Sequence, residues 1–191
     1  MRLKTRWFRH GGERGPEEVG EAAALAAWRV ATEAVRTLAE DGPVSERSGG
    51  HLALVEELLI FAVQYADRLA WLRGLDHEPR RRLVEAMARR LDAGVREHAT
   101  GDGAAGGGFL ERLGSRLEAY AAIAYREEDP GFAAYNLLGA SGCRAVGRER
   151  DTWLHARLAE VEGPEAVVEL RRGIGGLLEN LLSGASAGEG E

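Results

Sequence analysis

Cysteine and lysine are scarce in this chain, and histidine motifs that bind metals are absent. The one cysteine, Cys143, cannot form a disulfide within the chain, so we expect a buried thiol in a reducing compartment. None of the five histidines follows a glutamate by three positions, and no His-Glu-x-x-His motif occurs. We therefore expect no metal and no cofactor. The one lysine stands against 24 arginines, a bias typical of a GC-rich genome.

A basic excess is missing as well. The chain carries 31 acidic and 25 basic residues, a net charge of −6, which argues against a general nucleic-acid binder. The first extended apolar stretch, residues 22–28, follows four glutamates and is interrupted by Arg29, so no signal peptide is expected. Together with the single cysteine, these features predict a cytoplasmic protein.

What the chain does have is helical periodicity, most clearly over residues 52–73. Apolar residues cover about two thirds of this helix, and five polar residues form a narrow strip along the rest: Glu56, Glu57, Gln64, Asp67 and Arg68. A helix that is apolar over so wide an arc packs against neighbours on several sides, whereas the strip argues against a membrane span. We predict an all-α, single-domain bundle of six or seven helices around a central apolar helix at about 51–73.

The chain divides into three parts: a basic and aromatic arm over residues 1–15, a helical domain over 16–182, and a flexible tail over 183–191. Besides the central helix, the spacing predicts helices over 16–40, from about 76 onward, and over 109–128, 131–146, 150–161 and 164–182.

Small residues and helix breakers give this helical pattern its details. The first helix carries a stripe of mostly small residues, which permits close helix approach: Val19, Ala23, Ala26, Val30, Ala34 and Leu38. Gly139 and Gly142 are expected to weaken their helix, and Gly163 with Pro164 to separate the last two helices.

The polar strip of the central helix is a candidate ligand site. In this interpretation Asp67 is the acid/base or cation-binding group, Arg68 anchors an anion, and Glu56 and Tyr65 complete the pocket. Glu56 and Asp67 lie about 16 Å apart along the helix, too far to share one metal. Two other interpretations stay open: a structural polar layer that includes tyrosines of other helices (Tyr120, Tyr125 and Tyr135), or a strip that faces water.

The N-terminal arm is a candidate interaction segment. Its four cations and two adjacent aromatic residues lie within the first ten positions: Arg2, Lys4, Arg6, Arg9, Trp7 and Phe8. The rest of the chain contains the other 21 basic residues and all 31 acidic ones, so its net charge is −10. The arm either packs on its own bundle or on a second copy, or it contacts nucleic acid or a membrane surface; the usual burial of large aromatics favours packing.

Three further patterns favour structural roles. A set of arginines on the third helix is interleaved with acids, which is typical of a solvated face rather than a phosphate site: Arg80, Arg81, Arg82, Arg89 and Arg90. The glycine-rich segment 100–108 lacks the Gly-Lys-Ser/Thr of a phosphate-binding loop. Asp151 and His155, four positions apart, are expected to make a surface ion pair or hydrogen bond.

Four segments resemble an uncharacterised group of all-helical conserved bacterial proteins: MRLKTRWFR at the start, AAWRVATEAV, FAVQYADRLA and VEGPEAVVELRR. The resemblance covers most of the chain and implies a bacterial cytosolic protein. The group has no established activity, so it implies no site residues.

No residue pattern specifies a reaction, and we name no catalytic residues. We predict a regulatory or assembly interaction module that self-associates as a homodimer and binds a protein partner. The alternative is a small-molecule-binding protein or enzyme with its polar pocket beside the central helix.

Overall fold

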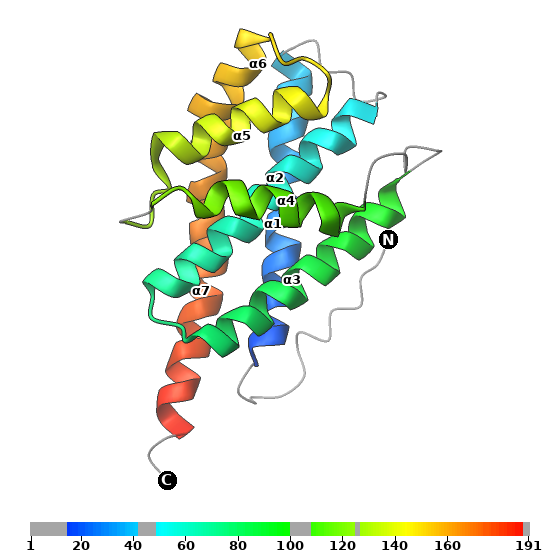
Figure 1. Ribbon diagram of the computed structural model, residues 1–191. Helices are drawn as coiled ribbons and strands as arrows, with labels where there is room; N and C mark the ends of the chain where they lie inside the picture. Colours follow the sequence, from blue (N-terminus) through cyan, green and yellow to red (C-terminus); the bar gives the residue numbers. More distant parts are fainter. Residues whose placement is uncertain (1–14, 42–48, 100–107, 125–126, 189–191) are drawn as a thin grey trace.

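The computed structural model describes residues 15–41, 49–99, 108–124 and 127–188 (Figure 1). Over these residues the chain forms seven α-helices and one π-helix and contains no strand, which confirms the predicted all-α bundle. The elements are α1 (Pro16–Asp41), α2 (Gly49–Leu72), α3 (His77–His98), α4 (Phe109–Ala121), α5 (Gly131–Ala145), α6 (Thr152–Arg157), the π-helix η2 (Leu158–Glu162) and α7 (Gly163–Gly188). Residues 1–14 of the arm and 100–107 of the glycine-rich segment lie outside the described residues.

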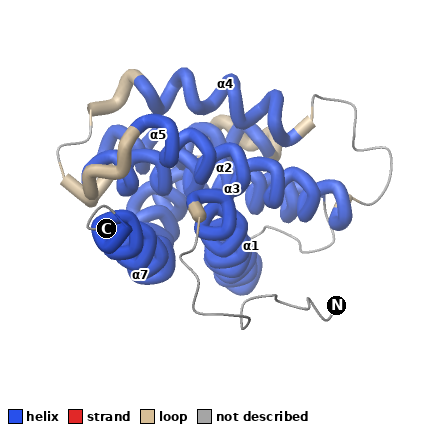
Figure 2. The backbone as a smooth tube through the Cα atoms, turned by 90° about the horizontal axis from the view of Figure 1, so that it is seen from below, coloured by secondary structure: helices blue, strands red, loops and turns tan. Residues whose placement is uncertain are grey.

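Helix α2 is the central helix, as its wide apolar arc predicts. Every residue from Leu54 to Ala66 is buried, and α2 contacts α1, α3, α4, α5 and α7. Viewed end-on, α1 and α7 lie side by side on one face of the bundle and α4 lies on the opposite face, with α2 between them (Figure 2). Between Leu54 and Ala66 the whole circumference of α2 is therefore covered.

Helices α1 and α3 approach each other closely because small residues line their contact. A Cβ atom on Gly20 would lie 2.3 Å from the backbone oxygen of Leu83, and one on Gly94 would lie 3.2 Å from the Trp28 ring. Ala23, Ala27 and their neighbours on the same face are buried. Five of the six residues of the predicted small-residue stripe are buried, which confirms it as a packing surface. The sixth, Ala26, lies against Gly173 of α7.

The predicted break at Gly163 and Pro164 is wrong. Helix α6, η2 and α7 follow one another without interruption, and Gly163 keeps a right-handed helical backbone (φ −63°, ψ −52°). Proline lacks the N–H that an α-helix would use at position 164. The π-turn, closed by a bond from the Gly163 amide to the Leu158 carbonyl, widens the helix at this point.

The end of α4 differs from the sequence prediction, and the glycines of α5 have a packing role. Helix α4 ends at Ala121 rather than at 128, because three consecutive acids and Pro130 follow, which disfavour a helical C-terminus. Helix α5 runs through Gly139 and Gly142 without a break. A Cβ on Gly139 would lie 2.8 Å from the His155 carbonyl, and one on Gly142 2.5 Å from Leu158, so both glycines permit α5 to pack on α6 and η2.

The last helix is longer than the sequence suggests. Helix α7 continues to Gly188, so residues 183–188, expected in the flexible tail, are helical. The segment holds no proline, and the Ser183 hydroxyl donates a hydrogen bond to the Glu179 carbonyl at 2.8 Å. This bond lies within the helix, just past the last buried leucine, Leu181.

Candidate functional site

The polar strip of α2 is buried at its N-terminal half by α4. Glu57, which is 4% exposed, accepts two hydrogen bonds from Arg116 at 3.2 Å each, and Glu56 pairs with Arg112. Burial raises the pKa of Glu56, although the Arg112 guanidinium opposes this shift. The strip therefore attaches α4 to the central helix through two ion pairs, as a structural polar layer would.

The four predicted site residues do not converge on one point. Asp67 pairs with Arg80 of α3 at 3.2 Å, and Arg68 donates to the Ala121 carbonyl at the end of α4 at 3.5 Å. Tyr65 is buried, and its hydroxyl accepts a hydrogen bond from Arg171 of α7 at 3.4 Å. Glu56 pairs with Arg112 of α4. Each of the four side chains therefore has a protein partner, and these partners belong to three different helices, α3, α4 and α7.

The tyrosines proposed for a polar layer have separate roles as well. The rings of Tyr120 and Tyr135 pack on Phe61 with centroid distances of 6.0 and 6.1 Å, and the Tyr135 hydroxyl donates to Asp129 at 3.3 Å. Tyr125 lies outside the described residues. Tyr120 and Tyr135 therefore contribute mainly to the aromatic core.

Sequence reasoning missed an ion-pair network at the C-terminal end of α2. Arg73 donates to Glu128 at 2.9 Å and to the Gly175 carbonyl at 2.9 Å, and Arg171 lies 3.4 Å from the other oxygen of Glu128. A Cβ on Gly175 would lie 3.0 Å from the Arg73 guanidinium, so the glycine gives that group room. The network connects α2 and α7 to the segment before α5.

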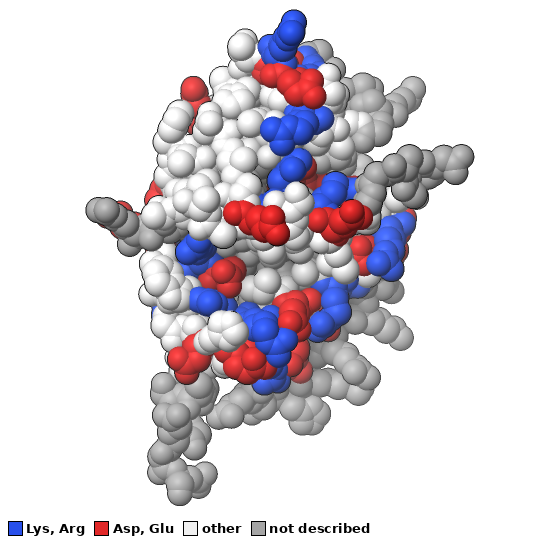
Figure 3. Space-filling view, viewed as in Figure 1, with Lys and Arg blue, Asp and Glu red and all other residues white. Residues whose placement is uncertain are grey.

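Charges on the α4 side of the molecule are interleaved, as the sequence predicts for the arginines of α3. Figure 3 shows basic and acidic side chains alternating over this face. Arg81 pairs with Glu78 at 2.7 Å and Arg82 with Glu17 at 2.6 Å. These pairs favour a solvated helix face over a phosphate site.

Asp151 and His155 do not form the pair that their spacing suggested. The Asp151 carboxylate accepts a hydrogen bond from the Leu154 amide at 2.9 Å, which caps α6, and also pairs with Arg148. His155 packs on Gly139 instead. Cys143 is buried as predicted, and burial raises the pKa of its thiol.

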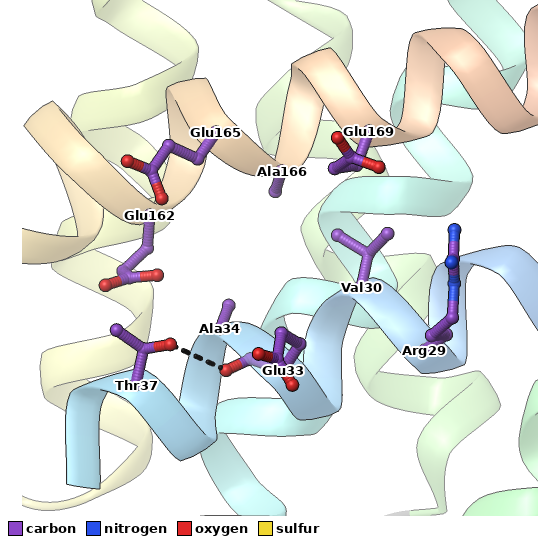
Figure 4. A pocket seen from close by; sticks show the side chains of 9 residues that line it. All are labelled: Arg29, Val30, Glu33, Ala34, Thr37, Glu162, Glu165, Ala166 and Glu169. Carbon is purple, nitrogen blue, oxygen red and sulfur yellow. Dashed lines mark hydrogen bonds between the residues drawn. The ribbon is translucent and has the colours of Figure 1, made fainter. Parts of the chain in front are cut away.

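A groove between α1 and α7 is the candidate binding site of this structure. It has a volume of about 340 Å³. Its lining combines an apolar floor with polar rims (Figure 4): Arg29, Val30, Glu33, Ala34, Thr37, Glu162, Glu165, Ala166 and Glu169. None of the four residues predicted beside α2 lines this groove, which we call the α1/α7 groove.

The antiparallel packing of α1 and α7 explains where the groove opens. At one end Ala26 meets Gly173, where an added Cβ would lie only 3.4 Å from the alanine methyl. At the other end Arg157 pairs with Asp41 at 2.8 Å. Between these contacts the facing side chains are Val30, Ala34 and Ala166, which are too short to fill the space.

The groove is acidic on both rims. Among its lining residues, four are glutamates and Arg29 is the one cation. Glu33 pairs with Arg36 and Glu169 with Arg172, at 2.9 Å in the second case, while Glu165 is exposed and has no ion-pair partner among the described residues. Glu162 is 2% exposed and accepts a hydrogen bond from Arg157 at 2.9 Å; burial raises its pKa.

The sequence carries only a weak signal for this groove. Val30 and Ala34 belong to the small-residue stripe of α1, which predicts close packing rather than open space. Glu165 and Glu169 flank Ala166 at a spacing of four, a pattern that fits any solvated helix face. The site exists only because two helices more than a hundred residues apart in sequence face each other.

Comparisons of the chain with known protein families, with curated proteins and with solved structures find no match. Within the described ranges, no group of three or more histidine, cysteine or acidic side chains is placed to hold a metal ion. No described helix is both long enough and apolar enough to cross a membrane.

Proposed function

We propose that this protein is an interaction module that holds a basic, partly apolar polypeptide segment in the α1/α7 groove. The observation that carries the proposal is the combination of an apolar floor with carboxylates on both rims. The floor takes apolar side chains, and the rims attract arginine or lysine side chains from either direction. The regulatory or assembly role and the cytoplasmic location expected from the sequence belong to this proposal.

The size of the groove favours a few side chains of a polypeptide over a large cofactor. A volume of about 340 Å³ lies at the lower end of the range for small-ligand pockets, about 300 to 1,000 Å³. A peptide laid along the groove would place one or two apolar residues on Val30, Ala34 and Ala166. Its cations would then lie beside Glu33, Glu165 and Glu169.

Self-association is compatible with the same site, because the chain carries a segment of the required chemistry in its own arm. The alternative expectation, a small-molecule pocket beside the central helix, stays a prediction. Glu56, Tyr65 and Asp67 already have arginine partners there.

A binding titration with a defined peptide tests the proposal. The probe peptide is a short fluorescein-labelled peptide of alternating arginine and leucine with one central tryptophan. Fluorescence anisotropy reports its binding to the full chain. The proposal predicts saturable binding that weakens about fivefold when Glu165→Gln and Glu169→Gln are combined, since both carboxylates lie on an exposed rim.

A matched variant controls for net charge. Glu111→Gln with Glu118→Gln removes the same charge from exposed positions on α4, on the opposite face of the bundle (Figure 2). This variant should bind the probe peptide like the unaltered protein. Equal weakening by both variants would mean that the peptide responds to overall charge and not to the groove.

A further inference from the structure

We infer that the first occupant of the α1/α7 groove is the chain's own N-terminal arm, bound within the same molecule. In this arrangement Trp7 and Phe8 would occupy the apolar floor, and the four arm cations would face the carboxylate rims. This inference rests on the proposed function, because it assumes that the groove accepts a basic and apolar segment. It adds the identity of the segment and a means of regulation.

Charge complementarity carries the first step. The arm concentrates four cations and two large aromatics within eight consecutive positions, from Arg2 to Arg9. The groove presents four glutamates and one arginine, Arg29, around three small apolar side chains. On the α4 face, by contrast, basic and acidic side chains alternate and pair with each other (Figure 3). Glu33, Glu162 and Glu169 also pair with arginines, so the groove differs from that face by its apolar floor and by Glu165, which has no ion-pair partner among the described residues. These two features suit the aromatic and basic arm better than the α4 face does.

The arm is long enough to reach the groove on its own molecule. Val30 and Ala34 lie about 21 and 27 Å along α1 from Pro16, at a rise of about 1.5 Å per residue. The nine residues from Trp7 to Pro16 span at most about 30 Å when extended. The aromatic pair is thus within reach of the groove floor on its own molecule. This arrangement requires the chain to reverse its direction before α1, and Gly11, Gly12 and Gly15 in that stretch of sequence permit such a turn.

Because the arm is joined to the bundle, it competes effectively with other polypeptide segments for the groove. A segment joined by a short linker has an effective concentration in the millimolar range, above that of a second copy at ordinary protein concentrations. A partner segment must then displace the arm before it binds. The arm acts as an internal competitor, and any partner that sequesters the arm opens the groove.

The single lysine makes the location of the arm directly measurable. Zero-length carbodiimide coupling joins a lysine amine to a carboxylate that lies against it, and Lys4 is the one lysine side chain in the chain. Peptide mass spectrometry of the coupled full chain should identify amide bonds from Lys4 to Glu33, Glu165 or Glu169. They should be lost at the substituted positions in the Glu165→Gln/Glu169→Gln variant and retained in Glu111→Gln/Glu118→Gln.

Isotope labelling separates the chain's own arm from that of a second copy. In a mixture of ¹⁴N and ¹⁵N protein, the inference predicts Lys4 bonds within one isotope. Bonds joining the two isotopes at the same glutamates would overturn intramolecular binding and indicate arm exchange. Bonds only to glutamates outside the groove, or none from Lys4, would overturn the inference altogether.

Probe-peptide binding distinguishes the two proposals. Trp7→Ala with Phe8→Ala should bind the probe peptide about threefold or more tightly, because the internal competitor is weakened. Unchanged affinity would overturn the role of the arm while leaving the groove as a binding site. If neither protein binds the probe peptide, the proposed function fails as well.

Discussion

The Arg157 guanidinium lies 2.8 Å from the Asp41 carboxylate, and this contact joins the end of α1 to the start of the α6–η2–α7 helix. The same guanidinium donates to the buried Glu162 at 2.9 Å. Arg157 therefore closes one end of the α1/α7 groove and neutralises the most buried carboxylate in its wall.

Replacing Arg157 by methionine should destabilise the protein by about 2 kcal/mol. Removing one partner of a buried pair typically costs about 3–5 kcal/mol, and the exposed quarter of the Arg157 side chain lowers that figure here. Urea denaturation of the variant measures the loss. Adding Glu162→Gln should recover much of it, because the amide carries no charge to leave unpaired. No recovery would contradict the role given to this pair.

The same variant should show a larger loss of stability at high pH. Burial raises the pKa of Glu162 above its value in the unfolded chain, so the folded protein holds this proton more tightly. That contribution is present at low pH and is lost as the pH rises through the raised pKa. Without Arg157 the pKa rises further. Denaturation at about pH 5 and about pH 8 should therefore give the larger deficit at pH 8, and the reverse order would contradict this assignment.

Helix α4 should loosen when its ion pairs with the central helix are removed. Arg116→Met leaves Glu57 buried without its partner and should cost about 3 kcal/mol. Hydrogen exchange over residues 109–121 should rise more than exchange in α1. Arg82→Met is the control, because its partner Glu17 lies on the surface, where ion pairs contribute little. Equal effects of the two variants would argue against a buried attachment of α4.

Two glycine substitutions test the close contact of α1 with α3. Gly20→Ala places a Cβ 2.3 Å from the Leu83 backbone oxygen, so the helices must separate, at a cost of about 3 kcal/mol. Gly114→Ala in α4 meets nothing within 4 Å and should stabilise the protein by about 0.5–1 kcal/mol. Chemical denaturation measures both, and a neutral Gly20→Ala would contradict the packing described.

Cys143 should react slowly with thiol reagents in the folded protein. Burial raises the pKa of the thiol, which lowers the fraction of reactive thiolate at a given pH, and the surrounding core excludes the reagent. Colorimetric thiol titration should show slow reaction in buffer and rapid reaction in denaturant. Rapid reaction in buffer would contradict the buried position.

The sequence predicts local features well and contacts between distant helices poorly. The apolar arc of α2 and the small-residue stripe of α1 follow from spacing along one helix, and the structure confirms both. The break at Gly163 was wrong because η2 depends on packing: a Cβ there would lie 3.0 Å from the Tyr135 ring. Tyr135 belongs to α5, and the residue spacing around position 163 carries no information about this contact.

The candidate site shows the same difference between local features, which the sequence predicts, and contacts between distant helices, which it does not. The polar strip of α2 is recognisable as a strip, yet its arginine partners come from α3, α4 and α7, which periodicity cannot assign. The α1/α7 groove exists because no larger side chain fills the space between Val30 and Ala166. It also depends on the relative direction of two helices that are distant in the sequence. The resemblance to an uncharacterised bacterial group stays a prediction.

Protection of a thiol placed inside the groove tests the central claim most directly. Thr37 lines the groove and Ser115 is exposed on α4; each is replaced by cysteine in the Trp7→Ala/Phe8→Ala protein, so that the result does not depend on the arm. With Cys143 buried, alkylation reports the introduced thiol. We predict that saturating probe peptide slows alkylation of Thr37→Cys about tenfold or more and leaves Ser115→Cys unchanged. Equal alkylation of Thr37→Cys with and without bound peptide would contradict the assignment of the α1/α7 groove as the binding site.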